Sequence, residues 1–180
     1  IKAMRDSADA YDWWVYKSDG SHAVSWCANS VDEWVLDVTD NCPLSPRGER
    51  FRDWYARTLR DSLVVGRQFG GIFLDQCHTT IYWLRQSNCN PSQIPLDLDR
   101  NGVGDADTTV TRLWANGMYD LLGQLRGHVG ASYPVVCNGA VNLVYDTAGK
   151  RLTDWLNGTM MECFLSLPPL RTDWYKNMFN

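Results

Sequence analysis

The sequence predicts an α/β fold in which the strands lie parallel in one sheet. Two observations lead to this prediction: short apolar runs alternate along the chain with longer stretches of helical periodicity, and each apolar run is almost continuous. Strand–helix–strand order implies right-handed crossovers between parallel strands. Parallel strands that are covered on both faces are apolar along their whole length. Such sheets occur either open or closed into a (β/α)8 barrel.

The first part of the chain is expected to supply a hairpin, two strands and one helix. Residues 13–26 suit a hairpin or an extended loop, with Asp19-Gly20 as its turn. The run "EWVLDVTD" predicts a first strand, and "GIFLD" predicts a second. Between them, Ser45-Pro46 is a typical helix start. It precedes an apolar stripe made of Phe51, Trp54, Tyr55 and Leu59.

The second part begins with a long polar insertion at about residues 76–107 and continues with alternating helices and strands. "YPVVCNG" predicts a third strand, residues 147–156 a short helix, and "GTMMECF" a fourth strand. Length alone indicates a single domain over residues 1–180. The strongest helix of the chain follows the insertion, with an apolar stripe of Val110, Leu113, Trp114, Leu121, Leu122 and Leu125.

Each of the four apolar runs ends on a polar side chain: Asp37, Asp75, Asn138 and Glu162. The carboxyl ends of parallel strands open into the ligand-binding crevice of a sheet or line the mouth of a barrel. An aspartate after a strand is also a frequent helix cap, which suits Asp37 equally well, and Asn138-Gly139 is a common turn. Asp75 and Glu162 favour a functional role, because no helix clearly starts at Asp75 and glutamate is a poor cap.

Two carboxylates that face each other at such an edge suit the hydrolysis of a glycosidic bond. One must be protonated to assist the leaving oxygen, and the other must be ionised to attack or to activate water. Burial and mutual repulsion separate their pKa values, which allows both roles near neutral pH. Trp26 and Trp34, in loop-like or strand-end stretches, offer flat faces on which a sugar can stack. His78, three residues after Asp75, is placed to touch a substrate, although an ordinary loop histidine looks the same.

These segments also resemble a known family. In chain order, "DWWVYKSDG", "WVLDVTD", "GRQFGGIFLDQ", "PVVCNGA" and "MMECF" are similar to the glycoside-hydrolase-like proteins of family fifteen. The resemblance spans about residues 10–165, and its sharpest pieces are "WVLDVTD", "GGIFLDQ" and "MMECF". The members of this family are expected to be TIM barrels, mostly of unassigned activity.

The resemblance implies a fold of the (β/α)8 TIM-barrel type, of which this chain covers only part, about strands 3–6. It also implies that Asp75 is the nucleophile and Glu162 the acid/base of a retaining glycoside hydrolase, with Asp37 and Asn138 orienting the substrate. A complete barrel typically needs about 250 residues. The 180 residues of this chain are therefore expected to be a portion of a longer polypeptide.

Residues 97–105 read "DLDRNGVGD" and predict a structural Ca²⁺ site. Oxygen ligands at the first, third and fifth positions, a glycine at the sixth, a carbonyl at the seventh and an acid at the ninth follow the logic of an EF-hand loop. The twelfth position is a threonine instead of the usual glutamate. The alternative is a solvated acidic turn without an ion. The expected ligands are Asp97, Asp99, Asn101, the carbonyl of Val103, and Asp105.

Charge and hydropathy exclude two classes of partner. The formal net charge is −4, the pI is about 5.3, and the basic residues are scattered, so we expect no nucleic-acid partner. No apolar run approaches the roughly 20 residues that a membrane span needs. The chain starts at Ile1 without an initiator methionine or a signal peptide, which fits a processed protein or an excised piece.

The six cysteines favour an oxidising compartment. Four of them lie in polar stretches in which disulfides commonly staple loops, and the expected pairs are Cys27–Cys42 and Cys77–Cys89. The other two lie in apolar, strand-like runs and are expected to be buried free thiols, namely Cys137 and Cys163.

The predicted function is that of a secreted glycoside hydrolase acting on a polysaccharide or oligosaccharide, and the N-glycosylation sequon at residues 157–159 fits export. Two alternatives stay open. One is a non-catalytic extracellular carbohydrate-binding or structural protein on a TIM-barrel scaffold, with its carboxylates salt-bridged or more than about 10 Å apart. The other is a metal-dependent hydrolase that uses Asp75, His78 and Glu162 together.

Overall fold

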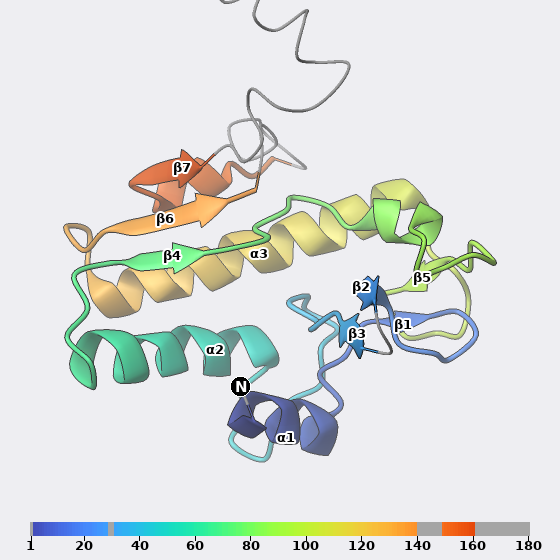
Figure 1. The fold of residues 1–180 in the computed structure, drawn as a ribbon, viewed down its shortest axis with the longest axis horizontal. Helices are drawn as coiled ribbons and strands as arrows, with labels where there is room; N and C mark the ends of the chain where they lie inside the picture. Colours follow the sequence, from blue (N-terminus) through green and yellow to red (C-terminus); the bar gives the residue numbers. More distant parts are fainter. Residues whose placement is uncertain (1, 29–30, 140–148, 161–180) are drawn as a thin grey trace, which may run out of the picture.

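The computed structural model describes residues 2–28, 31–139 and 149–160 (Figure 1). Its α-helices are α1 (Lys2–Tyr11), α2 (Phe51–Leu59) and α3 (Asp107–Val129). Shorter helical turns are η1 (Arg60–Val65, a π-helix) and the 3₁₀-helices η2 (Tyr82–Gln86) and η4 (Leu152–Trp155). The strands are β1 (Tyr16–Lys17), β2 (Val24–Ala28), β3 (Val31–Trp34), β4 (Ile72–Leu74), β5 (Leu96–Asp97), β6 (Val135–Asn138) and β7 (Gly158–Met160).

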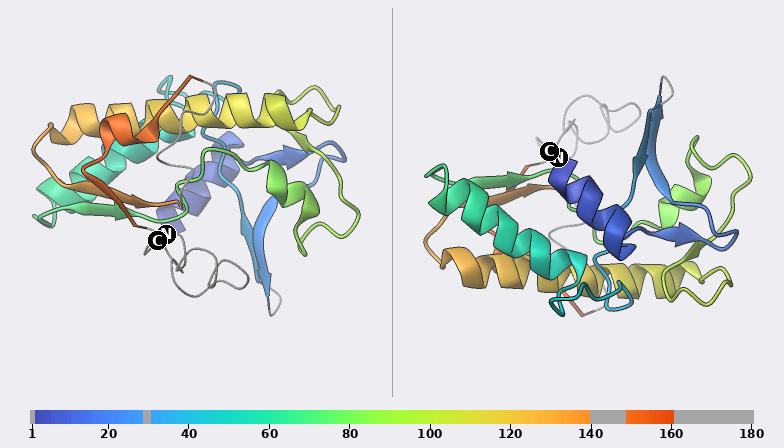
Figure 2. Two further views of the ribbon diagram at one scale, coloured as in Figure 1. Left: turned by 90° about the horizontal axis from the view of Figure 1, so that it is seen from above. Right: turned by 90° about the horizontal axis from the view of Figure 1, so that it is seen from below.

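A parallel sheet with strand order β4-β6-β7 lies alongside α3 (Figures 1 and 2). Its register places Ile72 opposite Val135 and Val136 opposite Gly158. The chain passes from β4 through α3 to β6, which is the strand–helix–strand unit that the sequence predicts. Ile72 and Leu74 are buried while Phe73 between them is 53% exposed, so one face of β4 carries the core.

The predicted (β/α)8 barrel is wrong. The described strands form three separate small sheets, and none of them closes into a barrel. The apolar run at residues 33–40 does not enter the parallel sheet, because β3 pairs antiparallel with β2 and Leu36 forms an antiparallel bridge with Trp14. Segments that are close in sequence pair at a low cost in loop-closure entropy. Local hairpin pairing therefore takes the place of the expected parallel neighbour.

Helix α2 confirms the predicted apolar stripe but begins at Phe51, six residues after Ser45. Residues 45–49 form a tight turn instead, in which the Ser45 hydroxyl accepts hydrogen bonds from the backbone N–H groups of Arg47 and Glu49, both at 3.3 Å. The carboxylate of Asp53 then accepts the backbone N–H of residue 50 at 2.8 Å and satisfies a free donor at the start of the helix.

The long helix α3 confirms the strongest helical prediction of the sequence. Its stripe packs into the core, with Val110, Trp114, Leu121, Leu122 and Leu125 all buried. Gly117 marks the closest approach of this helix to another segment, since a Cβ added there would lie 2.3 Å from the carbonyl oxygen of Val38. The segment that follows β3 is thus pressed directly against the backbone of α3.

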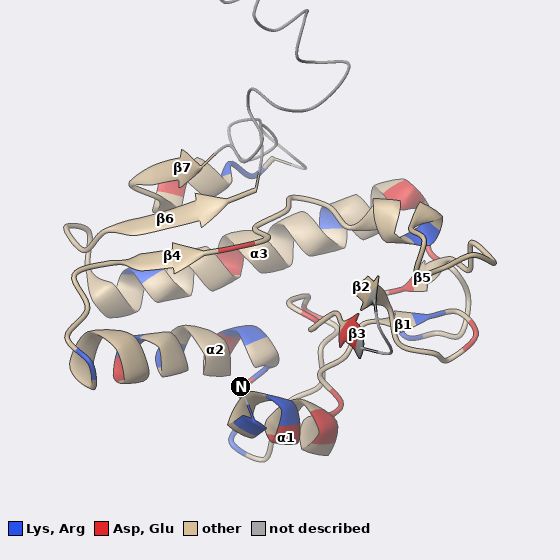
Figure 3. Cartoon of the chain, in the orientation of Figure 1, with Lys and Arg blue, Asp and Glu red and all other residues tan. Residues whose placement is uncertain are grey.

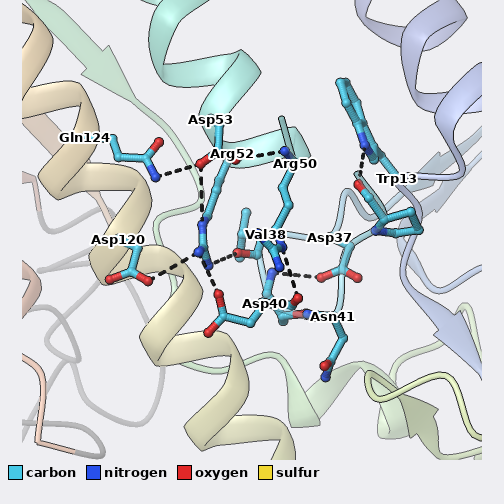
Figure 4. Close-up of polar contacts among 12 residues, drawn as sticks. Trp13, Asp37, Val38, Asp40, Asn41, Arg50, Arg52, Asp53, Asp120 and Gln124 are labelled. Atoms are coloured by element: carbon cyan, nitrogen blue, oxygen red, sulfur yellow. Dashed lines mark hydrogen bonds and ion pairs between the residues drawn. The ribbon is translucent and has the colours of Figure 1, made fainter. Parts of the chain in front are cut away.

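A buried arginine holds this segment between two helices (Figure 4). Arg52 of α2 is 7% exposed, and its guanidinium donates to the carbonyl oxygen of Val38 at 3.2 Å. The same group pairs with Asp40 at 2.6 Å and with Asp120 of α3 at 3.5 Å. Arg52 therefore ties α2, α3 and residues 38–40 together through its hydrogen bonds and ion pairs.

The expected hairpin of residues 13–26 is present in a shorter form. Tyr16 and His22 form an antiparallel bridge, and the N–H of Lys17 donates to the carbonyl of Ser21 at 2.8 Å. Gly20 adopts a φ of +79°, a conformation that suits glycine at the predicted turn. The predicted helix at 147–156 is seen in its described part as the single 3₁₀ turn η4.

The predicted disulfide pairs are wrong. Cys27 of the β2–β3 hairpin forms a disulfide with Cys89, while Cys42 and Cys77 are buried free thiols. Cys137 is a buried thiol, as the sequence predicts, and Cys163 lies outside the described residues. Sequence spacing pointed to near neighbours, but the fold brings together two cysteines that are 62 residues apart in the chain. No helix among the described residues is both long and apolar enough to cross a membrane.

Candidate functional site at the carboxyl edge of the parallel sheet

Asp75 and Asn138 meet at the carboxyl ends of two neighbouring parallel strands. Asp75 directly follows β4, and Asn138 is the last residue of β6. The register pairs Leu74 with Cys137, so the next residue on each strand lies at the same edge. The side-chain amide of Asn138 donates a 2.8 Å hydrogen bond to Oδ1 of Asp75. The structure thus brings together two of the four strand-end residues that the sequence singled out.

The Asp75 carboxylate is exposed and held from one side. The backbone N–H of Gln76 donates to the same oxygen, Oδ1, at 2.9 Å. Among the described residues, no donor reaches Oδ2. A carboxylate that accepts two hydrogen bonds through one oxygen is held in a preferred direction.

His78 lies close to this carboxylate but is partly buried. Its Nε2 atom is 2.8 Å from the side-chain oxygen of Gln76, and its ring packs edge-on against Trp83 at 5.6 Å. Burial lowers the pKa of His78, and the nearby charge of Asp75 acts in the opposite direction. A neutral imidazole at this position can donate or accept a hydrogen bond beside Asp75.

Glu162, the second predicted catalytic residue, lies outside the described residues. The strand that leads toward it is described. Strand β7 lies next to β6 and runs parallel to it, with Met160 opposite Asn138. The chain therefore leaves β7 at the edge of the sheet that carries Asp75 and Asn138.

Asp37 lies next to Val38 and close to Asp40, in the segment that Arg52 holds (Figure 4). It is 1% exposed, it accepts the backbone N–H of Thr39 at 2.8 Å, and its Oδ2 lies 3.6 Å from the guanidinium of Arg100. Burial raises the pKa of Asp37, and the contacts with Thr39 and Arg100 offset part of that rise. These contacts give Asp37 a place in the core rather than at the exposed edge of the sheet.

The two predicted stacking tryptophans belong to the β2–β3 hairpin, which is separate from the parallel sheet. The ring of Trp34 packs on that of His22 at 4.1 Å and meets Trp14 edge-on at 5.4 Å. Trp26 is 60% exposed. Neighbouring aromatic rings therefore pack against the ring of Trp34, whereas the ring of Trp26 is largely exposed to solvent.

The acidic loop at residues 97–105 places its carboxylates together. Oxygen atoms of Asp97, Asp99 and Asp105 lie within 4.8 Å of one another. Asp97 accepts the backbone N–H groups of Asn101 at 3.1 Å and Gly102 at 2.8 Å, which wraps the loop around this residue. The side-chain oxygen of Asn101 accepts the N–H of Val103 at 2.7 Å. All five expected ligand residues thus lie in one compact turn.

Burial and the neighbouring carboxylates both disfavour the ionised form of Asp105 in this loop, and hydrogen bonds from backbone N–H groups offset part of that effect. Burial raises the pKa of Asp105, and the charges of Asp99 and Asp97 raise it further. A divalent cation among these oxygens would remove the repulsion, because it would compensate the charges that oppose ionisation.

Arg100, for which no sequence pattern predicts a role, connects the acidic loop to the N-terminal part of the chain. Its guanidinium donates to Asp12 Oδ2 at 2.7 Å and to the carbonyl oxygens of Asp12 and Trp14, both at 2.8 Å. These partners are more than 80 residues away in sequence, so no local pattern could have revealed the contact. A cavity of about 270 Å³ beside it is lined by Asp12, Tyr16, Lys17, Ser18, Gly20, Asp97, Arg100 and Gly102.

Comparison with protein-family models and with curated proteins gives no match for this chain. The resemblance to the glycoside-hydrolase-like proteins of family fifteen therefore rests on the sequence motifs alone.

Over the described part of the chain, basic and acidic residues are intermixed on the helices (Figure 3).

Proposed function

We propose that this chain is part of a secreted glycoside hydrolase that cleaves O-glycosidic bonds in a polysaccharide or oligosaccharide. The observation that carries the proposal is the pairing of Asp75 with Asn138 at the carboxyl edge of three adjacent parallel strands. This edge is where α/β proteins of several kinds place their ligands. Acidic and basic residues alternate along the described helices (Figure 3), which suits an uncharged sugar better than a polyanion.

In the proposed reaction, Asp75 attacks the anomeric carbon while Glu162 protonates the departing oxygen. Glu162 then removes a proton from water, which releases the sugar from Asp75 with retention of configuration. This mechanism needs the two carboxyl groups at a separation of about 5 Å. Asn138 positions the nucleophile, since its amide donates to Oδ1 and directs the other oxygen toward the substrate. His78 is proposed to contact the sugar from the loop that follows Asp75.

The test is hydrolysis of a panel of polysaccharides by the complete polypeptide and by three variants. Asp75→Asn and Glu162→Gln should each lower kcat by roughly 1,000-fold or more, because each removes a group that reacts with the substrate. Asp6→Asn is the matched control, since Asp6 is an exposed aspartate on α1 and pairs only with Lys2 in the described structure. The control should keep full activity.

Thermal unfolding of the same variants shows whether a variant that has lost activity is still folded. Wild-type protein that binds oligosaccharides but releases no reducing sugar would contradict the proposal and indicate a non-catalytic carbohydrate-binding protein. Near-full activity of Asp75→Asn would also contradict it.

We further propose that the loop at residues 97–105 holds a structural Ca²⁺ ion. The clustered oxygens of Asp97, Asp99 and Asp105 support this proposal, together with the compact turn around them. Asn101 and the carbonyl of Val103 would complete the ligand set. The ion would supply positive charge to an acidic turn and take no part in the reaction.

Export through an oxidising compartment is the remaining part of the proposal. The Cys27–Cys89 disulfide supports it, because stable disulfides are rare in reducing compartments.

A further inference from the structure

Two buried thiols meet next to the Asp75–Asn138 pair. Cys137 lies within β6 and is fully buried, and Cys77 lies three residues beyond the end of β4 and is 2% exposed. The backbone N–H of Cys77 donates to the carbonyl of Asn138 at 2.8 Å, which holds the chain after β4 against β6. The two Sγ atoms are 2.8 Å apart.

This separation is shorter than an ordinary contact between two thiols. Non-bonded carbon atoms pack at roughly 3.5–4.0 Å, and sulfur is larger than carbon. Two bonded sulfurs lie about 2.0 Å apart. Because the backbone already brings the two sulfurs this close, a small side-chain adjustment is enough for a bond. We propose that Cys77 and Cys137 form a second disulfide, in addition to Cys27–Cys89.

The reaction is a thiol–disulfide exchange with a small disulfide such as oxidised glutathione. One cysteine thiolate attacks the small disulfide and displaces one thiol from it, and the second cysteine thiolate then attacks the mixed disulfide and displaces the other. The protein loses two protons and two electrons, and the oxidant becomes two thiols. The contact with Cys137 together with burial raises the pKa of the Cys77 thiol, which suppresses the reactive thiolate in the folded protein. The bond therefore forms during folding, before the pair is buried.

The bridge would join residue 77 to β6 and so fix the loop that carries Asp75 against the neighbouring strand. Its formation does not depend on the proposed hydrolase activity. The disulfide can therefore be present whether or not the protein is a hydrolase.

Peptide mapping of protein produced by secretion tests the bond directly. The protein is denatured, alkylated without reduction and digested with trypsin, which places Cys77 in peptide 68–85 and Cys137 in peptide 127–150. The expected species joins these two peptides, and it should disappear on reduction. The Cys27–Cys89 bond is the internal control, because it joins peptides 18–47 and 86–100 in the same digest.

Two results would overturn the inference: alkylated Cys77 and Cys137 in a digest in which the control link is complete, or Cys77 joined to a different cysteine. A variant provides an independent measurement. In Cys27→Ala/Cys89→Ala, reductant should lower the melting temperature by roughly 5–15 °C, because only the Cys77–Cys137 bond remains to be broken. Adding Cys77→Ala and Cys137→Ala should abolish this sensitivity, whereas adding Cys42→Ala should preserve it. If reductant does not change the melting temperature of Cys27→Ala/Cys89→Ala, the Cys77–Cys137 bond is absent.

Discussion

The carboxyl group of Asp37 is buried, and its polar contacts offset only part of the free-energy cost of burying its charge. Its Oδ1 accepts the backbone N–H of Thr39 at 2.8 Å, while Arg100 lies 3.6 Å from Oδ2. Burial raises the pKa of Asp37 above its ordinary value of 3.8. The carboxyl therefore keeps its proton to a higher pH in the folded state than in the unfolded state. A group of this kind makes the fold less stable as the pH rises from the unfolded pKa through the folded one.

Replacing Asp37 with asparagine should remove this pH dependence. The free energy of unfolding of Asp37→Asn should increase relative to the wild type as the pH rises from about 4 to about 7. Asparagine keeps the oxygen that accepts the Thr39 N–H, and Arg100 keeps its 2.7 Å pair with Asp12. Urea unfolding at several pH values measures the difference. Asp6→Asn should change little across the same range, and a wild type that gains stability over Asp37→Asn with rising pH would contradict the account.

Among individual residues, the positions that could be predicted are those that strand direction alone decides. Asp75 and Asn138 end two apolar runs that turned out to be parallel neighbours, so their side chains lie at one edge. Asp37 ends a run of similar appearance, but that run pairs in a local hairpin and its last residue is buried against Arg100. Periodicity describes the strand itself and says nothing about its partner.

At the scale of elements, α3 is the support on which the sheet and the segment after β3 are placed. Two of its glycines differ in their surroundings. At Gly117 an added Cβ would lie 2.3 Å from a backbone oxygen of Val38, whereas at Gly127 it would meet no atom within 4 Å. The first glycine is required by packing, and the second is only a weak point in the helix.

These surroundings predict opposite effects of one substitution. Gly117→Ala should destabilise the protein by roughly 1–3 kcal/mol, because backbone atoms of residue 38 must move to accept the methyl group. Gly127→Ala should stabilise it by about 0.5–1 kcal/mol, because alanine favours the helix and restricts the unfolded chain. Thermal or urea unfolding of the two variants measures both effects. Equal changes in both variants would show that α3 does not press on the Val38 segment.

Helices α2 and α3 and the three strands of the parallel sheet could be predicted because their signals are local, whereas α1 at Lys2–Tyr11 was not predicted. The apolar stripes of α2 and α3 and the runs that became β4, β6 and β7 all appear in the sequence. The start of α2 could not be placed, since the Ser45 hydroxyl binds two nearby N–H groups in a turn before the helix begins. Closure into a barrel failed as a prediction because it depends on which strands become neighbours.

At the scale of the whole molecule, ionic contacts join segments that are far apart in the sequence. Arg52 joins α2 to α3 and to residues 38–40 (Figure 4). Arg100 joins the acidic loop to Asp12 and to the carbonyl of Trp14. An ion in the acidic loop would therefore stabilise the N-terminal segment as well as the loop itself.

Removal of Ca²⁺ should lower the stability of the whole protein. A chelator should lower the melting temperature, and Ca²⁺ at about 100 times its dissociation constant should add about 2.7 kcal/mol of stability. Asp99→Asn should weaken binding in calorimetry, and Asp6→Asn should leave it unchanged. Because the pKa of Asp105 is raised, protons compete with Ca²⁺ for this carboxylate at a higher pH than for an ordinary aspartate, and binding should weaken as the pH falls. Identical melting temperatures with calcium and with chelator would contradict a structural ion.

The central claim is that Asp75 is the nucleophile of a retaining glycoside hydrolase. A 2-deoxy-2-fluoro glycoside of the sugar that the protein cleaves tests this claim most directly, because it traps the glycosyl-enzyme intermediate. Tryptic mass mapping should find one glycosyl group on Asp75 in peptide 68–85, and Asp75→Asn should not be labelled. A label on a different carboxylate, or hydrolysis of the natural substrate by Asp75→Asn at the wild-type rate, would contradict the account.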